Sequence, residues 1–342
     1  MTHMDLLHQL WLGTPAWMWL AFLGLVAALL AFDLGVLNRK DHEIGVAESL
    51  RLSALYIAMG LAFGAGVWWY LGREAGLDYL TGFIVEKSLA MDNVFVIAMI
   101  FGYFGVPREY QHRVLFWGIL GVIALRAIMI GLGAALIQNF GWVLYIFGAF
   151  LIYTGVKMWR HAGETYEVGK SPALAWLRRH TRVTDEIRGH DFWVVKPDPV
   201  TGEPARHATP LLMALIMIEF ADVVFAVDSV PAIFAITTDP FIVYTSNIFA
   251  VLGLRALYFA LAAMVERFHY LKYALAALLV FIGVKIFAAD LLGIDKVPPP
   301  VSLGATFAIL AVGIAWSLWR TRGKSGSGAG KARALEPDRK LS

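Results

Sequence analysis

Two stretches of the chain place acidic side chains inside otherwise apolar sequence. Residues 86–101 read EKSLAMDNVFVIAMIF, and residues 219–233 read EFADVVFAVDSVPAI. Carboxylates in low-dielectric surroundings repel one another unless protons, a cation or basic side chains neutralise them. The pattern therefore predicts a cation site, a proton pathway or buried ion pairs. The acids concerned are Glu86, Asp92, Glu219, Asp222 and Asp228.

The groups beside these acids narrow the choice of cation. Asn93 and Ser229 each follow one of the acids directly, and Pro231 removes the helical hydrogen bond to the carbonyl of Val227. All of these groups offer oxygen, which suits Mg²⁺, Ca²⁺ or Mn²⁺ as ligand atom. The chain has no Cys, which excludes disulfides and thiolate metal sites. The apolar stretches also lack His in their middle, which argues against Cu⁺ and, more weakly, Zn²⁺.

The composition indicates that the acids lie in a polytopic membrane protein. Of the 342 residues, 59% are hydrophobic and 16% are charged, whereas soluble domains are about 45–50% apolar. A span needs about 20 apolar residues, and lipid admits only helices or closed barrels. The predicted fold is all-α, with nine transmembrane helices. They cover residues 16–37, 49–71, 77–102, 111–136, 140–159, 210–236, 241–265, 271–292 and 301–319.

Lys and Arg counts in the connecting segments predict the orientation of these helices. Residues 1–15 carry no Lys or Arg, residues 160–209 carry eight, and the tail from Arg320 is basic. Because basic loops stay in the cytosol, we expect the N-terminus outside, which would be the periplasm if the membrane is a bacterial inner membrane, and the C-terminus inside.

The expected organisation follows from the spans and the connecting segments. Two leading helices lie in 16–71, and two three-helix units lie in 77–159 and 210–292. The cytosolic loop 160–209 contains a short predicted hairpin in 191–210, around Pro-Asp-Pro-Val-Thr-Gly. The ninth helix, 301–319, precedes a Gly/Ser-rich cytosolic tail, 320–342, which we predict to be disordered.

The two three-helix units repeat each other in sequence. Arg126 matches Arg255, and Glu86 with Asp92 matches Asp222 with Asp228. An odd number of helices inverts the second copy across the membrane, and inverted repeats are typical of secondary transporters with a site near the midplane. The longer matches are LIYTGVKMW (151–159) with LVFIGVKIF (279–287), and ALRAIMI (124–130) with GLRALYF (253–259).

Inversion also predicts which acids meet. Six residues of helix rise about 9 Å, too far for one ion to contact both acids of a motif. We therefore expect an outer layer of Glu86 and Asp228. An inner layer would hold Asp92 and Asp222, with Glu219 one turn further inward.

Buried basic residues leave a structural alternative open. Arg126 and Arg255 lie deep in predicted spans and would pair with two of the five acids, leaving about three without a fixed partner. Lys157 and Lys285 are predicted near helix ends, where long side chains extend to the interface. Asp33 is either a gate residue or an interfacial one.

Three segments carry a family resemblance. EKSLAMDNVFV, FADVVFAVDSVPAIFAITTDPFIVYTSNIFAVLGLRALYF and LLVFIGVKIF resemble the TerC family of integral membrane proteins, within the wider LysE-like transporter group. The resemblance covers about residues 15–320. It implies a bacterial inner-membrane protein of a family associated with manganese export and tellurite resistance, with one branch linked to manganese homeostasis at alkaline pH. The transport residues it implies are Glu86, Asp92, Glu219, Asp222 and Asp228, flanked by Asn93 and Ser229.

The resulting hypothesis is a transporter that exports Mn²⁺ from the cytosol, with H⁺ antiport and no cofactor; manganese itself rests on the resemblance. A second hypothesis is export of a small organic cation or amino acid, whose carboxylate Arg126 or Arg255 would bind. A third is a membrane partner that delivers metal to secreted enzymes or assists the secretion machinery. Self-association is also open. We expect no enzyme, because no nucleophile–base arrangement appears, and no nucleic-acid partner.

Overall fold

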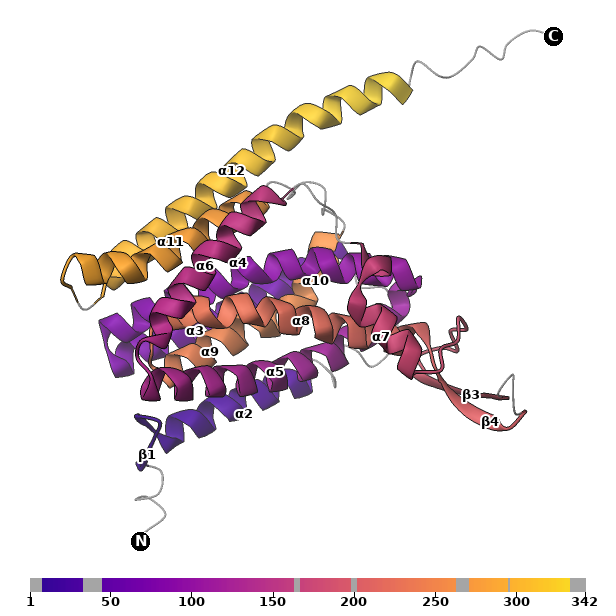
Figure 1. The fold of residues 1–342 in the computed structure, drawn as a ribbon, viewed down its shortest axis with the longest axis horizontal. Helices are drawn as coiled ribbons and strands as arrows, with labels where there is room; N and C mark the ends of the chain where they lie inside the picture. The colour runs from indigo at the N-terminus through magenta and orange to yellow at the C-terminus, as the bar shows by residue number, and fades with distance from the viewer. Residues whose placement is uncertain are drawn as a thin grey trace.

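The apolar segments form long α-helices that run alongside one another in a computed structural model of the chain (Figure 1). The structure describes residues 8–32, 45–162, 167–197, 202–262, 271–294 and 296–332. The helices in the first half are α2 (Ala16–Phe32), α3 (Val46–Leu71), α4 (Arg73–Phe104), α5 (Arg108–Asn139), α6 (Val143–Arg160) and α7 (Pro172–His180). Those in the second half are α8 (Pro210–Phe234), α9 (Pro240–Leu252), α10 (Leu254–Ala262), α11 (Leu271–Leu291) and α12 (Pro299–Ala332).

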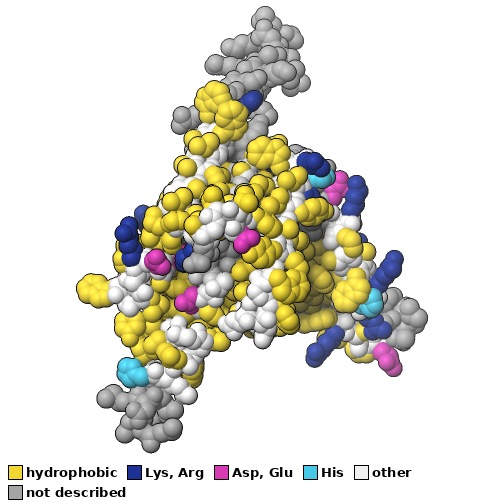
Figure 2. All heavy atoms as spheres, turned by 60° about the vertical axis from the view of Figure 1, so that its left-hand side comes forward, with side chains coloured by type: hydrophobic (Ala, Val, Ile, Leu, Met, Phe, Trp, Pro, Cys, Tyr) yellow, Lys and Arg dark blue, Asp and Glu magenta, His cyan; other side chains and the backbone are white. Residues whose placement is uncertain are grey.

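Several of these helices can cross a membrane. Within the described residues, six segments are long and apolar enough: α3, α5, α8, α9 with α10, α11, and residues Pro299–Ser317 of α12. Apolar side chains also cover most of the face shown in Figure 2. The chain is therefore a multi-pass membrane protein. The remaining predicted spans, 16–37, 77–102 and 140–159, fall on α2, α4 and α6, and the total of nine stays a prediction.

Turn residues end and begin these helices. Gly72, with φ +96°, separates α3 from α4, and Gly105, in the left-handed region, ends α4. Pro240 opens α9, whose first amides donate to the carboxylate of Asp239. Such caps satisfy backbone donors that a helix leaves free at its start.

The predicted span 241–265 is not one continuous helix. It is interrupted at Gly253, between α9 and α10. Lys87 of α4 fills the interruption, and its Nζ donates to the carbonyl oxygen of Ala250 at 3.0 Å. A Cβ at Gly253 would lie 2.6 Å from that Nζ. A lysine from another helix thus caps the carboxyl end of α9, where a positive charge is favourable.

Short strands and a 3₁₀ turn lie outside the bundle. Strands β1 (Leu10–Trp11) and β2 (Thr14–Pro15) form a tight hairpin before α2. Strands β3 (Trp193–Pro197) and β4 (Pro204–Ala208) pair antiparallel, which confirms the hairpin predicted in residues 191–210. Its turn residues 198–201 lie outside the described residues. The 3₁₀ turn η2 (Val168–Lys170) precedes α7.

The described residues bear on the predicted end of the last span and on the predicted tail. Helix α12 continues to Ala332, past the predicted span end at residue 319 and into the tail predicted to be disordered. Residues 333–342 lie outside the described residues, as does Asp33.

Helices α6 and α11 pack closely against each other at glycine residues. A Cβ at Gly155 would lie 2.7 Å from the carbonyl oxygen of Ala276, and one at Gly283 would lie 2.6 Å from that of Gly148. Small residues let helix backbones approach in this way inside membranes. Elsewhere α5 packs on α8, while α4 packs on both α8 and α9. The acidic motifs of α4 and α8 therefore lie at the centre of the bundle.

Candidate cation site in the helix bundle

Arg126 of α5 lies at the centre of the buried acidic residues. Its Nη1 forms an ion pair with Glu86 Oε1 on α4, while its Nη2 and Nε approach Asp222 of α8 at 3.2 and 3.4 Å. All three residues are at most 4% exposed. A buried charge is costly unless it is paired and hydrogen-bonded. The structural alternative expected Arg126 and Arg255 to pair with two of the acids, and the structure pairs two acids with Arg126.

A buried amide completes this cluster. Asn247 of α9, fully buried, donates from Nδ2 to Glu86 Oε2 at 3.0 Å and accepts from Arg126 Nη1 at 3.1 Å. The hydroxyl of Ser229 lies 3.5 Å from the same Nη1. Two carboxylates and one guanidinium leave the cluster with one negative charge when all are ionised.

The remaining central acids line a small internal cavity. Asp92 of α4 and Asp228 of α8 both face it, together with Asn93, Ser229 and the ion pair of Glu86 with Arg126. Its volume is about 20 Å³, and about 10–15 Å³ suffices for one water molecule. The space therefore fits a single water or a single ion. Asn93 is 4% exposed, and its side-chain amide oxygen, Oδ1, has no hydrogen-bond partner among the described residues.

The predicted two-layer pairing of the acids holds only in part: Glu86 and Asp228 of the outer layer line the same small cavity, whereas Asp92 and Asp222 of the inner layer line no common cavity. Glu86 and Asp222, assigned to different layers, meet at Arg126, and Asp92 shares its cavity with Asp228 rather than with Asp222. The physical reason is helix rotation: six residues turn a helix by about 240° beyond a full turn. The first acid of each motif therefore pairs with Arg126, whereas the second lines the small cavity beside it.

The other predicted residues occupy neighbouring positions. Asp222, Asn93 and Arg255 line a second cavity of about 20 Å³, so Asn93 borders both small cavities. Glu219 is half-buried and packs against Gly121 of α5, where a Cβ would collide with its carboxylate. Its side chain lines neither cavity, although it lies one turn from Asp222 on the same helix face.

A wide cavity of about 630 Å³ adjoins the small one. Both are lined by Asp92 and Phe225, so these two side chains form the boundary between them. The wide cavity lies at the end of the bundle where α6 ends and α11 begins, and His161, Glu167 and Lys272 also line it.

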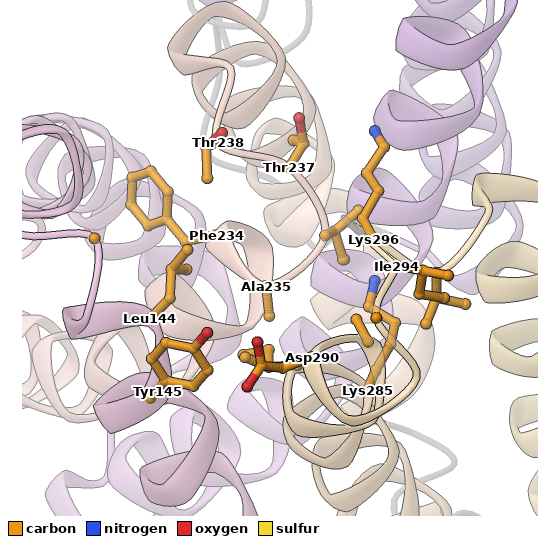
Figure 3. A pocket seen from close by; sticks show the side chains of 16 residues that line it. Leu144, Tyr145, Phe234, Ala235, Thr237, Thr238, Lys285, Asp290, Ile294 and Lys296 are labelled. Atoms are coloured by element: carbon orange, nitrogen blue, oxygen red, sulfur yellow. The ribbon is translucent and has the colours of Figure 1, made fainter.

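A third cavity, of about 580 Å³, opens at the opposite end of the same helices (Figure 3). Tyr145, Thr237 and Asp290 line it, with Lys285 and Lys296 on one side. Along α8, residues of the three cavities follow in order, from 217–225 through 225–229 to 234.

Apolar side chains separate the small cavity from the third one. Leu151 of α6, Ile233 of α8 and Ile282 of α11 lie between the two cavities along their helices and are at most 2% exposed. All three belong to one buried hydrophobic cluster. We call these three residues the apolar plug.

The two lysines at the third cavity have hydrogen-bond partners. Lys296 Nζ donates to Asp78 Oδ2 at 3.1 Å, and Lys285 Nζ donates to Ser302 Oγ at 3.2 Å. Lys285 is 8% exposed. The expectation that this lysine extends to the membrane interface is wrong, because α12 covers it and Ser302 supplies a hydrogen-bond acceptor. Its counterpart Lys157 is exposed.

The described residues contain no preassembled metal cluster, since no three His, Asp or Glu side chains among them converge on one point. Sequence reasoning also missed Asn247, Lys87 and the Asp78–Lys296 pair. For Asn247 a signal was present, because the amide stands in the middle of the apolar run FIVYTSNIFAVL.

Long apolar helices that pack around a buried charged cluster define the class of the molecule: it is a multi-pass integral membrane protein. The family described as "Integral membrane protein TerC family" matches residues 71–325. The chain belongs to this family.

Named relatives are similar over most of the chain. An "Uncharacterized membrane protein" of Myxococcus xanthus is 48% identical over 310 residues, which are 91% of this chain and 94% of the relative. The "Putative membrane-bound redox modulator Alx" of Escherichia coli K12 is also 48% identical, over 316 residues, 90% of this chain and 95% of the relative. An "Uncharacterized membrane protein" of Rickettsia bellii is 44% identical over 302 residues, 88% and 97% of the two chains. No solved structure matches the chain.

Proposed function

We propose that this protein is a secondary transporter of the bacterial inner membrane that exports Mn²⁺ from the cytosol. One observation carries the proposal: Asp92 and Asp228, equivalent acids of the two motifs, line one cavity of single-ion size. Arg126 already neutralises Glu86 and Asp222 in part, so these two carboxylates, with the amide oxygen of Asn93, are the groups available to a cation.

Helix packing supports the proposed repeat. The sequence match pairs Gly155 with Gly283, and the same offset pairs Gly148 with Ala276. The two close contacts, Gly155 with Ala276 and Gly283 with Gly148, are therefore exchanged by the repeat. The packing of α5 on α8 and of α4 on α9 is exchanged in the same way. Reciprocal contacts are what a two-fold relation between α4–α6 and α8–α11 produces.

The cavities support a state open to the cytosol. In the proposed topology, the wide cavity beside Asp92 faces the cytosol and the third cavity faces the periplasm. A cation entering from the cytosol reaches Asp92 first and then the small cavity, whereas the apolar plug closes the other side. Export requires a rearrangement of the two units that parts Leu151, Ile233 and Ile282, as in alternating access.

The third acid at the small cavity, Glu86, is paired with Arg126, so the transport geometry must form when the ion binds. Mn²⁺ prefers oxygen ligands, and Asp92, Asp228 and Asn93 supply three, with water able to supply others. When the ion leaves, two adjacent carboxylates in low dielectric favour taking up a proton. Proton antiport follows from this exchange. The choice of manganese among the hard cations rests on the family resemblance.

The name of the Escherichia coli relative suggests a second candidate function, that of a membrane-bound redox modulator. This chain has no Cys, so a redox role of its own would not use thiol–disulfide exchange. A role in redox balance through the cytosolic metal level is compatible with export. Export of an amino acid is less favoured, because Arg126 is already engaged by two acids.

The test is Mn²⁺ flux in proteoliposomes with and without a pH gradient. We expect Asp92→Asn and Asp228→Asn to abolish flux, while Asp185→Asn, an exposed acid outside the bundle, leaves it unchanged. Loss of flux when the gradient is dissipated would establish proton coupling. Full flux in both cavity variants would refute the proposed site, and absence of flux in the wild type would favour the metal-delivery or secretion role.

A further inference from the structure

A groove on the outer surface of the bundle has no role in the proposed transport path. It lies between α6, α11 and α12 and has a volume of about 660 Å³. The small side chains Ala274, Ala277 and Ala308 form its floor, and Gly313 lets α12 approach α11 at Ala274. Beyond this contact, α12 extends away from the bundle (Figure 1). The groove is thus an apolar channel that opens toward the carboxyl end of α12.

Aromatic side chains form the rim at that end. Trp159 and Tyr273 make an edge-to-face contact at 5.3 Å between ring centres. On the opposite wall, Trp316 packs against Trp319 at 5.5 Å. Trp and Tyr gather at the level of lipid headgroups in membrane proteins. The rim therefore marks where the groove reaches the membrane surface.

A positive charge stands at the same rim. The guanidinium of Arg320 lies 5.4 Å from the centre of the Trp316 ring and lines the groove. Arg160, the exposed last residue of α6, follows the rim residue Trp159. Within the described part of the chain, the residues that line the groove include no Asp or Glu. By the predicted topology, this rim is on the cytosolic side, where anionic lipid attracts basic residues.

We propose that this groove binds an anionic phospholipid of the cytosolic leaflet. An acyl chain lies over Ala274, Ala277 and Ala308, and the headgroup phosphate is bound by Arg320. The position of the exposed Arg320 over the Trp316 ring holds the guanidinium beside the rim of the groove. The apolar floor selects a lipid over a free phosphate, and the arginine selects an anionic headgroup over a zwitterionic one.

Native mass spectrometry of the purified full-length protein tests this site. The protein is mixed with equal amounts of phosphatidylglycerol and phosphatidylethanolamine of the same acyl chains. We expect preferential retention of phosphatidylglycerol, reduced about fivefold by Arg320→Gln, the effect of one cation at an anionic lipid surface. Arg179→Gln, an exposed arginine of α7, removes the same charge elsewhere and should leave retention unchanged.

A second variant separates the groove from its charge. Ala308→Phe fills the floor and should reduce retention of both lipids while the protein stays monodisperse. Equal retention of phosphatidylglycerol by Arg320→Gln and the wild type would overturn the proposal. It would also be overturned if Ala308→Phe dissociated a dimer without changing lipid retention, because the groove would then be an interface between two copies of the chain.

Discussion

Arg126 and Asp222 face each other across the interface of α5 and α8 through two contacts, Nη2 to Oδ1 at 3.2 Å and Nε to Oδ2 at 3.4 Å. This two-point geometry fixes the orientation of the guanidinium. The remaining nitrogen, Nη1, is then directed at Glu86 and Asn247. One arginine thereby connects α4, α5, α8 and α9 at the centre of the bundle.

Replacing Arg126 by Met should destabilise the protein by about 3–5 kcal/mol, because two buried carboxylates lose their counter-charge. The measurement is thermal unfolding of the purified protein in detergent. Adding Glu86→Gln to Arg126→Met should recover part of the loss, since one of the unpaired charges is then removed. Strictly additive destabilisation in the double variant would contradict the ion-pair assignment.

Replacing Asn247 by Leu should cost about 1–3 kcal/mol, because Glu86 Oε2 loses its amide donor inside the bundle. Thermal unfolding again provides the measurement. Asn139→Leu serves as control, because that amide is exposed and contacts only the carbonyl of Ala135 in its own helix. An equal effect of the two substitutions would show that the contact of Asn247 with Glu86 does not matter.

Replacing Gly283 by Val should push α11 away from α6 and destabilise the protein by about 1–3 kcal/mol, the range for overpacking. Gly155→Val should act in the same direction, because a Cβ there would lie 2.7 Å from the carbonyl oxygen of Ala276. A Cβ at Gly66 of α3 meets nothing within 4 Å, so Gly66→Val is the matched control. The measurement is the unfolding temperature of the three variants. An unchanged unfolding temperature in Gly283→Val would refute the close packing of α6 and α11.

Replacing Lys87 by Leu should cost about 1–3 kcal/mol, because the Ala250 carbonyl loses its donor where α9 ends. Lys87→Arg should retain most of the stability, since a cationic donor remains at the helix end. Hydrogen exchange of the α9–α10 segment is the sharper measurement: we expect faster exchange there in Lys87→Leu and not in Lys87→Arg. Unchanged exchange in both variants would remove the proposed cap.

The pattern of apolar runs predicted the helical class and most helix positions, because length and hydropathy are local properties. It also placed acids at the bundle centre, as Glu86 and Asp222 show. The pairing of Asp92 with Asp222 was mispredicted, because level along the membrane was considered without rotation about the helix axis. That rotation depends on how neighbouring helices dock, and here Arg126 selects the first acid of each motif.

Two further features escaped prediction for the same tertiary reason. No Pro marks the interruption at Gly253, and the group that stabilises it, Lys87, comes from a helix more than 160 residues earlier in the chain. Lys285 is buried only because α12 folds over it and offers Ser302. Contacts of this kind are invisible in a local window of sequence.

The interruption between α9 and α10 has a consequence for energetics. Its counterpart in the proposed repeat, α5, runs unbroken from Arg108 to Asn139, so the two proposed units differ in this helix. In an exporter built of identical inverted halves, the empty inward-facing and outward-facing forms would be mirror equivalents with equal free energy. A capped break in one half alone removes that degeneracy. In such an exporter the unloaded protein would have a preferred resting side, while the ion gradients would still set the direction of net transport.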